Sequence, residues 1–312
     1  MTMGIINKMF KWFTTKDKGD NEINLGNVLD GEPTTIQDIE KVFKAFQLDK
    51  YFETIKPLVR PKIDITLSPT DESKFNTPKS KIGGQPHLMI EQEWPKNELG
   101  KPLSFIGQLN FEEVSKLDKS ELLPKQGLLS FFYCADQETW GFDPKDNQRF
   151  KTIYTENVNE LVKQEFPSDL ESHSIFHPNL LTFTSSLSIP TWEDDSIEGL
   201  IEDEDSDNYF EASRGSDNQI LGYANCIQGT MELECQLVTN GLYCGDPTGY
   251  EDPRRKELEA GKDNWVLLLQ IDSEEDKTGM MWGDSGRIYF WIKKQDLISK
   301  NFDKTWCILQ CY

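Results

Sequence analysis

The stretch most like catalytic machinery is Gly-Asp-Ser-Gly, at 283–286. Ser285 would be the nucleophile of a serine hydrolase, and such a serine needs a histidine base and an oxyanion hole beside it. Arg287 follows where the trypsin-like pattern has a second glycine, and no Ala-Ala-His-Cys segment precedes it. No Gly-x-Ser-x-Gly elbow occurs either. We therefore expect these residues to form a turn that enters a strand at 286–292.

Two histidines have the spacing of helical zinc ligands. His173 and His177 stand four residues apart, but Pro178 follows at once and a strand-like run begins soon after. His87 is the only other histidine in the chain, so a site with three histidines would have to recruit it. We expect an ordinary surface loop at 173–177 and no metal site there.

An acidic run has the opening spacing of a calcium loop. Asp203, Asp205 and Asp207 alternate as the loop requires, but Asn208 and Arg214 stand where the loop needs Gly and Glu. A second candidate, beginning at 272, fails at the same two positions. No Gly-x-Gly-x-x-Gly or Gly-x-x-x-x-Gly-Lys-Ser/Thr loop is present. The sequence therefore predicts no metal and no cofactor.

Composition limits the partners of this protein. The 312 residues include 54 Asp and Glu but 33 Lys and Arg, which gives a formal charge of −21. Such a surface repels phosphate backbones and anionic membranes, so we expect no nucleic-acid partner. The same charge favours solubility and suits a basic protein partner.

The cysteines indicate a reducing compartment. None of the six forms a Cys-x-x-Cys pair, and no secretory segment precedes them, so we expect free thiols in the cytoplasm. A nucleophilic cysteine would need a histidine and electropositive surroundings, which an acidic protein rarely offers. Residues 3–18 combine apolar positions at helical spacing with four lysines. This segment is too short to span a membrane, so it docks on its own domain, frays, or associates with a membrane surface.

The elements expected along the chain are mostly strands. A helix capped by Thr35 is predicted to run to Pro57, and a second helix is predicted over 157–166. Asn110, with Glu113 three residues later, is predicted to cap a short helix. Alternating or apolar runs predict the strands 62–67, 127–134, 149–156, 180–189 and 286–292. We expect four parts: an N-terminal segment at 1–33, a first half at 34–190, an acidic connector at 191–215 and a second half at 216–312.

The second half resembles the first in the order of its motifs. "SKIGGQPHL" aligns with "NQILGYANC", and "PLSFIGQLNFEE" aligns with "NWVLLLQIDSEE". This alignment pairs Gly84 with Gly222, Gln108 with Gln270 and Asn110 with Asp272. "GLLSFFYC" and "RFKTIYTE" likewise align with "GRIYFWIK" and "FDKTWCIL". We expect an α+β protein dominated by antiparallel sheet, with an internal duplication that gives two related β-rich halves and peripheral helices.

These motifs resemble a known family. "IGGQPHL" with "EWP", "PLSFIGQLNFEE", "NWVLLLQIDSEE" and "GMMWGDSGRIYFWIKKQDLISKNFDKTWCILQCY" are similar to the YwqG-like proteins, the domain-of-unknown-function family DUF1963. The resemblance covers roughly 35–312 and implies a β-rich α+β fold with two related halves. It implies no established activity. One departure is "LGYANC", where the family more often has a Gly-Gly-Tyr-Pro type of turn.

Any binding site is expected between the two halves, because pockets favour such interfaces. The residues predicted to face this cleft are Gln108, Asn110, Tyr223, Gln270, Asp272, Trp282 and Asp284. The alternative is that these groups satisfy backbone atoms at strand ends.

Two functions remain open. The first is a non-enzymatic binding protein that takes a basic partner, for example a toxin to be neutralised. The second is a carboxylate-dependent hydrolase or small-ligand enzyme that uses groups such as Asp272 and Asp284.

Overall fold

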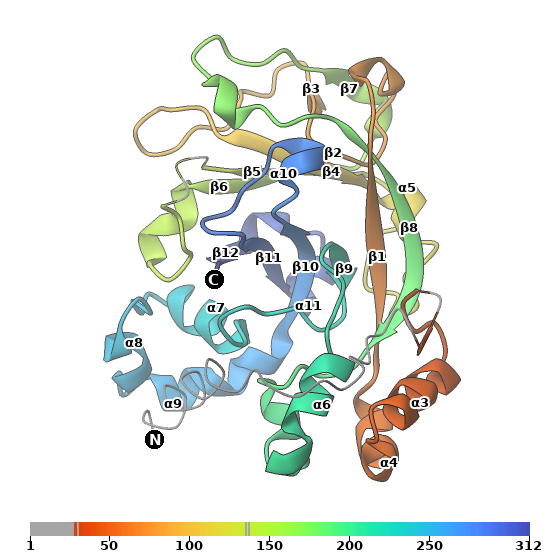
Figure 1. Ribbon diagram of the computed structural model, residues 1–312. Coiled ribbons are helices and arrows are strands. Elements are labelled where there is room, and N and C mark those ends of the chain that lie inside the picture. The colour runs from red at the N-terminus through yellow and green to blue at the C-terminus, as the bar shows by residue number, and fades with distance from the viewer. Residues whose placement is uncertain (1–27, 30, 135, 137) are drawn as a thin grey trace.

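The protein is built around one ten-stranded sheet (Figure 1). The computed structural model describes residues 28–29, 31–134, 136 and 138–312. The sheet order is β12-β11-β10-β9-β1-β8-β2-β4-β5-β6, and β3 pairs with β7 in a separate small sheet. The strands are β1 (Arg60–Pro69), β2 (Lys81–Ile82), β3 (His87–Met89), β4 (Ser104–Asn110), β5 (Leu128–Tyr133), β6 (Phe150–Thr155), β7 (Leu161–Lys163), β8 (Asn179–Ser188), β9 (Gln219–Leu221), β10 (Trp265–Asp272), β11 (Arg287–Lys293) and β12 (Trp306–Gln310).

The helices are short and lie around the sheet. They are α3 (Ile36–Ala45), α4 (Phe52–Ile55), α5 (Phe111–Val114), α6 (Ser206–Ala212), α7 (Glu232–Val238), α8 (Pro247–Glu251), α9 (Arg255–Leu258), α10 (Glu275–Thr278) and α11 (Lys294–Ile298). The chain is therefore an α+β protein dominated by antiparallel sheet, as the sequence predicts.

The two longest strands, β1 and β8, pair antiparallel at the centre of the sheet. Their register runs from Arg60 opposite Ser188 to Pro69 opposite Asn179. β2 extends the sheet from β8, and β9 extends it from β1. Each of these short strands leads into a three-stranded meander, β4-β5-β6 in one arm and β10-β11-β12 in the other.

The sheet curls until its two edge strands approach each other. The Thr152 hydroxyl in β6 donates a hydrogen bond to the carbonyl of Phe302, at 2.8 Å, in the loop before β12. In return, the Leu309 amide of β12 donates to the carbonyl of Trp140, at 3.1 Å, in the loop before β6. Each arm thus covers the exposed edge of the other, which gives a near-barrel and removes a template for aggregation.

One apolar core fills the interior of the curled sheet. Phe131 of β5 meets Phe290 of β11 at a centroid separation of 4.9 Å, and the Tyr133 ring stands edge-on to Trp282. Both arms contribute buried residues to this single cluster, and the first arm adds a small separate cluster around Phe105 and Phe132.

A second, smaller core lies under α3, α4 and α6. The α3 helix begins as predicted, because Thr35 and Asp38 form a reciprocal capping box. The prediction that this helix continues to Pro57 is wrong: α3 ends at Ala45, and Gln47 takes a left-handed φ of 59° before α4 begins. Residues Ile197, Ile201 and Tyr209 of the predicted acidic connector bury their side chains in this core.

One further prediction is decided by tertiary pairing and another by local capping. The helix expected over 157–166 is wrong, since Leu161–Lys163 forms β7 and pairs with β3. Asn110 caps α5 as expected, with its side chain accepting from the Glu112 amide at 3.0 Å.

Among the described residues, no helix is long and apolar enough to cross a bilayer. The predictions made for residues 3–18 lie outside the described residues.

Candidate functional site

Gln108 occupies the centre of a buried turn in the first arm. Its side-chain oxygen accepts from the His87 amide at 3.0 Å, and its nitrogen donates to the carbonyl of Lys79 at 2.7 Å. The enclosed turn contains Gly83 and Gly84, at φ of 70° and 71°. A Cβ on Gly84 would lie 2.1 Å from the Glu72 carboxylate, so this position requires glycine.

Gln270 holds the equivalent turn in the second arm. Its oxygen accepts from the Asn225 amide at 2.9 Å, and its nitrogen donates to the carbonyls of Ser216 and Asp217 at 2.8 and 2.9 Å. The enclosed turn again has two left-handed residues, Leu221 at a φ of 61° and Gly222 at 72°. The two glutamines therefore bridge a carbonyl before the short strand and an amide after it.

The next polar pair differs between the arms. The Asn110 amide donates to the Ser80 hydroxyl, and the Asp272 amide donates to the Asn218 side chain, both at 2.9 Å. Burial raises the pKa of Asp272 to about 6, although the nearby Arg287 guanidinium opposes that shift.

Arg287 forms an ion pair with the Asp272 carboxylate. Its Nε lies 2.9 Å from Asp272 Oδ1, with an angle too poor for a hydrogen bond, and its Nη2 donates to Asp217 at 2.8 Å. Its Nη1 also donates to the Asn225 carbonyl, which ties the pair to the Gln270 turn.

The remaining predicted site residues are dispersed. The Tyr223 hydroxyl donates to the Leu58 carbonyl at 2.8 Å, and the Arg60 guanidinium lies over its ring at 4.0 Å. Trp282 is buried in the main core, whereas Asp284 is exposed and its carbonyl accepts from the Tyr312 amide. Of the seven residues, only Tyr223 lines either of the two best-defined cavities, so the cleft between the halves stays a prediction.

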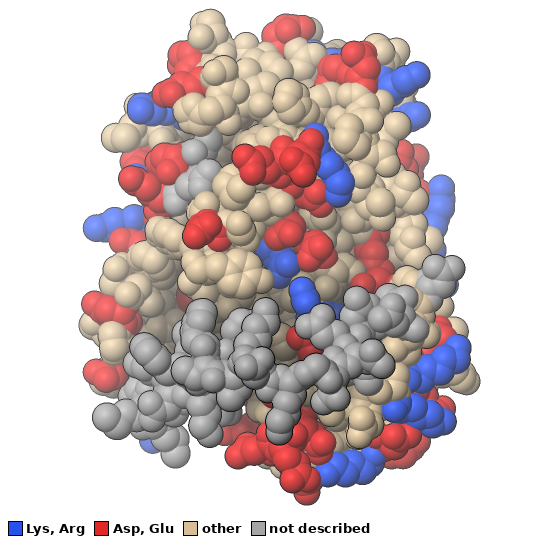
Figure 2. Space-filling view, viewed as in Figure 1, with Lys and Arg blue, Asp and Glu red and all other residues tan. Residues whose placement is uncertain are grey.

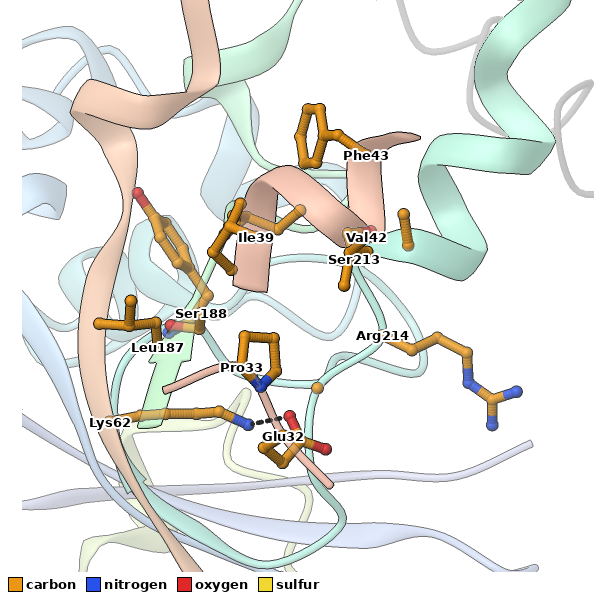
Figure 3. Close-up of a pocket in the computed structure, with 14 residues that line it drawn as sticks. Glu32, Pro33, Ile39, Val42, Phe43, Lys62, Leu187, Ser188, Ser213 and Arg214 are labelled. Carbon is orange, nitrogen blue, oxygen red and sulfur yellow. Dashed lines mark hydrogen bonds and ion pairs between the residues drawn. The ribbon is translucent and has the colours of Figure 1, made fainter. Parts of the chain in front are cut away.

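That cavity lies where α3 meets the central strands (Figure 3). Its apolar wall includes Ile39, Val42 and Phe43, and its volume of about 20 Å³ has room for roughly one water molecule. Figure 3 shows Lys62 and Glu32 pointing toward each other below Pro33. The cavity is too small for an organic substrate.

Lys62 makes this cavity chemically interesting, because its Nζ lies 2.7 Å from the Ser216 hydroxyl. A serine beside a neutral lysine can act as a nucleophile, with the lysine as its general base. Here, however, the ammonium also contacts Glu32 at 3.0 Å and Asp64 at 2.8 Å, and the Ser216 hydroxyl donates to Asp64. The ammonium thus hydrogen-bonds Glu32 and Ser216 and forms an ion pair with Asp64, and an ammonium has no lone pair with which to accept a proton.

This buried network was missed by the sequence predictions. Lys62 and Asp64 alternate with Ile63 and Ile65 in β1, which is the pattern of a strand with one solvated face. Both polar side chains are nevertheless largely covered, since Lys62 is 1% exposed and Asp64 is 12% exposed. No signal in the sequence marks the segments that cover this face.

A second buried cluster surrounds the Gly-Gly turn. Burial lowers the pKa of Lys81 to about 8, and its Nζ lies 2.9 Å from the Glu72 carboxylate. Burial also lowers the pKa of His87 to about 4, so that histidine is neutral near pH 7. Neither of the two best-defined cavities opens onto Lys81 or His87, and we assign them to the support of the turn.

The other motifs with possible chemistry take structural roles. Ser285 lies in an exposed turn at a φ of 52°, and the Gly286 amide donates to the Trp282 carbonyl, as expected of a turn that enters β11. His177 donates its amide to the Thr278 carbonyl. In the described part of the chain, the one group of three potential metal ligands is Glu202, Glu204 and Asp205, and Lys50 already contacts two of them.

The fold and these contacts define a β-rich α+β protein with two curled arms, each opened by a glutamine-held turn. A family model described as a domain of unknown function, DUF1963, matches residues 80–311. The chain belongs to this family. The match begins near β2, so it excludes α3, α4 and β1, which the sequence resemblance had included. No curated protein is significantly similar to this chain.

Proposed function

We propose that this protein is a non-enzymatic binding protein whose acidic surface takes a basic protein partner. The observation that carries the proposal is the composition of residues 191–212, which contain ten Asp and Glu and no Lys or Arg. We call these residues the acidic segment. Figure 2 shows carboxylates gathered at the lower edge of one face, where Figure 1 places α6.

The acidic segment is held in place by its apolar residues. Tyr209 is fully buried, and its hydroxyl donates to the Pro190 carbonyl at 2.9 Å. The Tyr51 hydroxyl donates to Asp205 at 2.6 Å, which ties the segment to the base of α4. Carboxylates on a fixed scaffold require less ordering when a partner binds, and their summed field accelerates encounter with a cationic surface.

A specific form of the proposal is neutralisation of a basic toxin. A basic partner would bring lysines and arginines that the acidic segment lacks, and the complex would weaken as salt rises. The compartment we propose is the reducing cytoplasm, which the six free cysteines support.

The test is co-purification at about 50 mM salt, within the range where surface electrostatics are strong. The wild type is expected to recover a basic protein that is lost when Glu202, Asp203, Glu204 and Asp207 are changed to their amides. A matched control changes the exposed Glu91, Glu93, Glu251 and Glu257 to Gln, which removes the same charge elsewhere. Recovery of no partner, or equal loss in both variants, contradicts the proposal.

The carboxylate-dependent hydrolase is the second candidate, and Asp272 is the observation that favours it. Its pKa of about 6 is within the range of a general base. The Asp272→Asn variant separates the candidates, because an enzyme would lose its turnover while partner binding through the acidic segment would persist.

We also infer that the two arms arose by duplication of one unit. What supports this is the matching set of hydrogen bonds at Gln108 and Gln270, together with the same strand order outward from β8 and from β1. The partner residues are also equivalent in position, since Lys79 and Asp217 each stand two residues before the short strand. An experimental structure in which the arms fail to superpose on these glutamines would remove the support.

A further inference from the structure

The Trp-Pro motif at 94–95 builds one wall of an open groove on the outer face of the first arm. The Trp94 indole donates to the Leu103 carbonyl at 2.8 Å, and its ring stands edge-on to Phe132 at 5.6 Å. The Leu103 amide donates back to the Pro95 carbonyl at 2.9 Å. The indole therefore fixes both ends of the loop between residues 94 and 103.

The tip of this loop is fixed as well. The buried Asn97 side chain accepts from the amides of Leu99 and Lys101, both at 3.0 Å. Arg149 then clamps the loop to the segment before β6, with two guanidinium nitrogens donating to one oxygen of Glu98 at 3.0 and 2.8 Å. The groove wall is thus preorganised before any partner arrives.

The groove between this loop and β6 has a volume of about 260 Å³, close to the lower end of ligand pockets. Its lining is Gln92, Pro95, Lys96, Leu103, Asn147, Gln148, Phe150, Lys151 and Ile153. The lining combines apolar side chains with three side-chain amides and two lysines. No carboxylate contributes to it, although the whole chain carries a charge of −21.

We propose that this groove binds a short acidic segment of a partner protein in extended conformation. Pro95 and Ile153 are partly exposed and offer an apolar surface for one or two side chains. The amides can pair with peptide N–H and C=O groups, and Lys96 and Lys151 attract the flanking carboxylates. The inference is independent of the acidic segment, because it concerns a different surface and the opposite charge.

Both lysines are available to a ligand. Lys96 is exposed and has no ion pair among the described residues. Lys151 contacts Asp303 at 2.6 Å, but the two side chains are 48% and 74% exposed. An ion pair this exposed contributes little, so an incoming carboxylate can replace Asp303.

The experiment selects a displayed library of ten-residue peptides on the full-length protein and then measures synthetic copies of the selected peptides by fluorescence polarisation. Selected peptides are expected to carry Asp or Glu beside an apolar residue. Lys96→Glu is expected to weaken their binding at least ~3-fold at low salt. Lys116→Glu, a matched reversal at an exposed lysine outside the groove, should leave binding unchanged.

Several outcomes overturn the inference. They are the absence of peptides selected above bare support, selection of basic peptides, and binding that is unaffected by Lys96→Glu. Equal competition by a short single-stranded oligonucleotide also overturns it, because the groove would then be a general anion site. The variant with four amides in the acidic segment should still bind the selected peptides, which keeps this test separate from that of the basic partner.

Discussion

Replacement of Gln270 by Ala tests whether the glutamine-held turns are structural. The side chain accepts one backbone hydrogen bond and donates two, and it is fully buried. Each backbone group left without a partner costs about 1–3 kcal/mol. Water can reach some of these partly buried groups, so we expect Gln270→Ala to lower the free energy of unfolding by about 3–5 kcal/mol.

The measurement is urea unfolding followed by tryptophan fluorescence. Small and medium-sized domains have free energies of unfolding of about 5–15 kcal/mol, so the expected loss shifts the midpoint clearly. Gln108→Ala should cost a similar amount, since its side chain bridges the equivalent carbonyl and amide. Gln228→Ala is the control, because this exposed side chain makes no hydrogen bond among those described and should change stability by less than about 0.5 kcal/mol.

A Gln270→Ala protein with the unfolding midpoint of the wild type would contradict a structural role for this side chain. The turn would then be held by other groups, and the buried amide would be free for a different role. A loss at Gln270 with none at Gln108 would contradict the equivalence of the two arms.

Three further predictions concern pH, the seam and a strained turn. Burial raises the pKa of Glu232 to about 7, so between about pH 4.5 and 7 the folded protein holds a proton that the unfolded chain releases. The contribution of Glu232 to the free energy of unfolding therefore falls as the pH rises through this range. Glu232→Gln should leave stability nearly unchanged at pH 4.5 and raise it by about 1–3 kcal/mol at pH 8, whereas Glu257→Gln at an exposed position should change it at neither pH. Thr152→Val removes one of the two hydrogen bonds described across the seam of the near-barrel and should cost about 1–2 kcal/mol in urea unfolding, and an unchanged midpoint would mean that the seam does not depend on it. Leu221→Gly relieves roughly 1 kcal/mol of left-handed strain but loses about 1.5–3 kcal/mol of side-chain burial, so the variant should be less stable, and a more stable one contradicts this balance.

The strands of this protein are readable from sequence where local pattern and burial agree. The apolar run at 127–134 forms β5, all of whose residues are buried. The run at 286–292 forms β11 after the turn that contains Ser285. Asn110 was identifiable as a helix cap, because capping needs only the neighbouring amides.

The failures come from contacts that are distant in the sequence. The residues at 157–166 have helical periodicity, but Leu161 pairs with Met89 in a strand, and Met89 lies 72 residues earlier (161 − 89). The buried charge of Lys62 depends on Glu32 and Ser216, which approach it from two different segments. The groove beside the Trp94 loop was not predicted, because Arg149 clamps this loop to the segment before β6 and no local pattern specifies that clamp.

The most direct test of the central claim is a calorimetric titration of the captured basic partner into the purified protein at about 50 and 200 mM salt. We expect the Kd to rise at least roughly tenfold between these two conditions, and the variant with four amides in the acidic segment to bind weakly at both. A Kd that is independent of salt, or an acidic-segment variant that binds as tightly as the wild type, would contradict it.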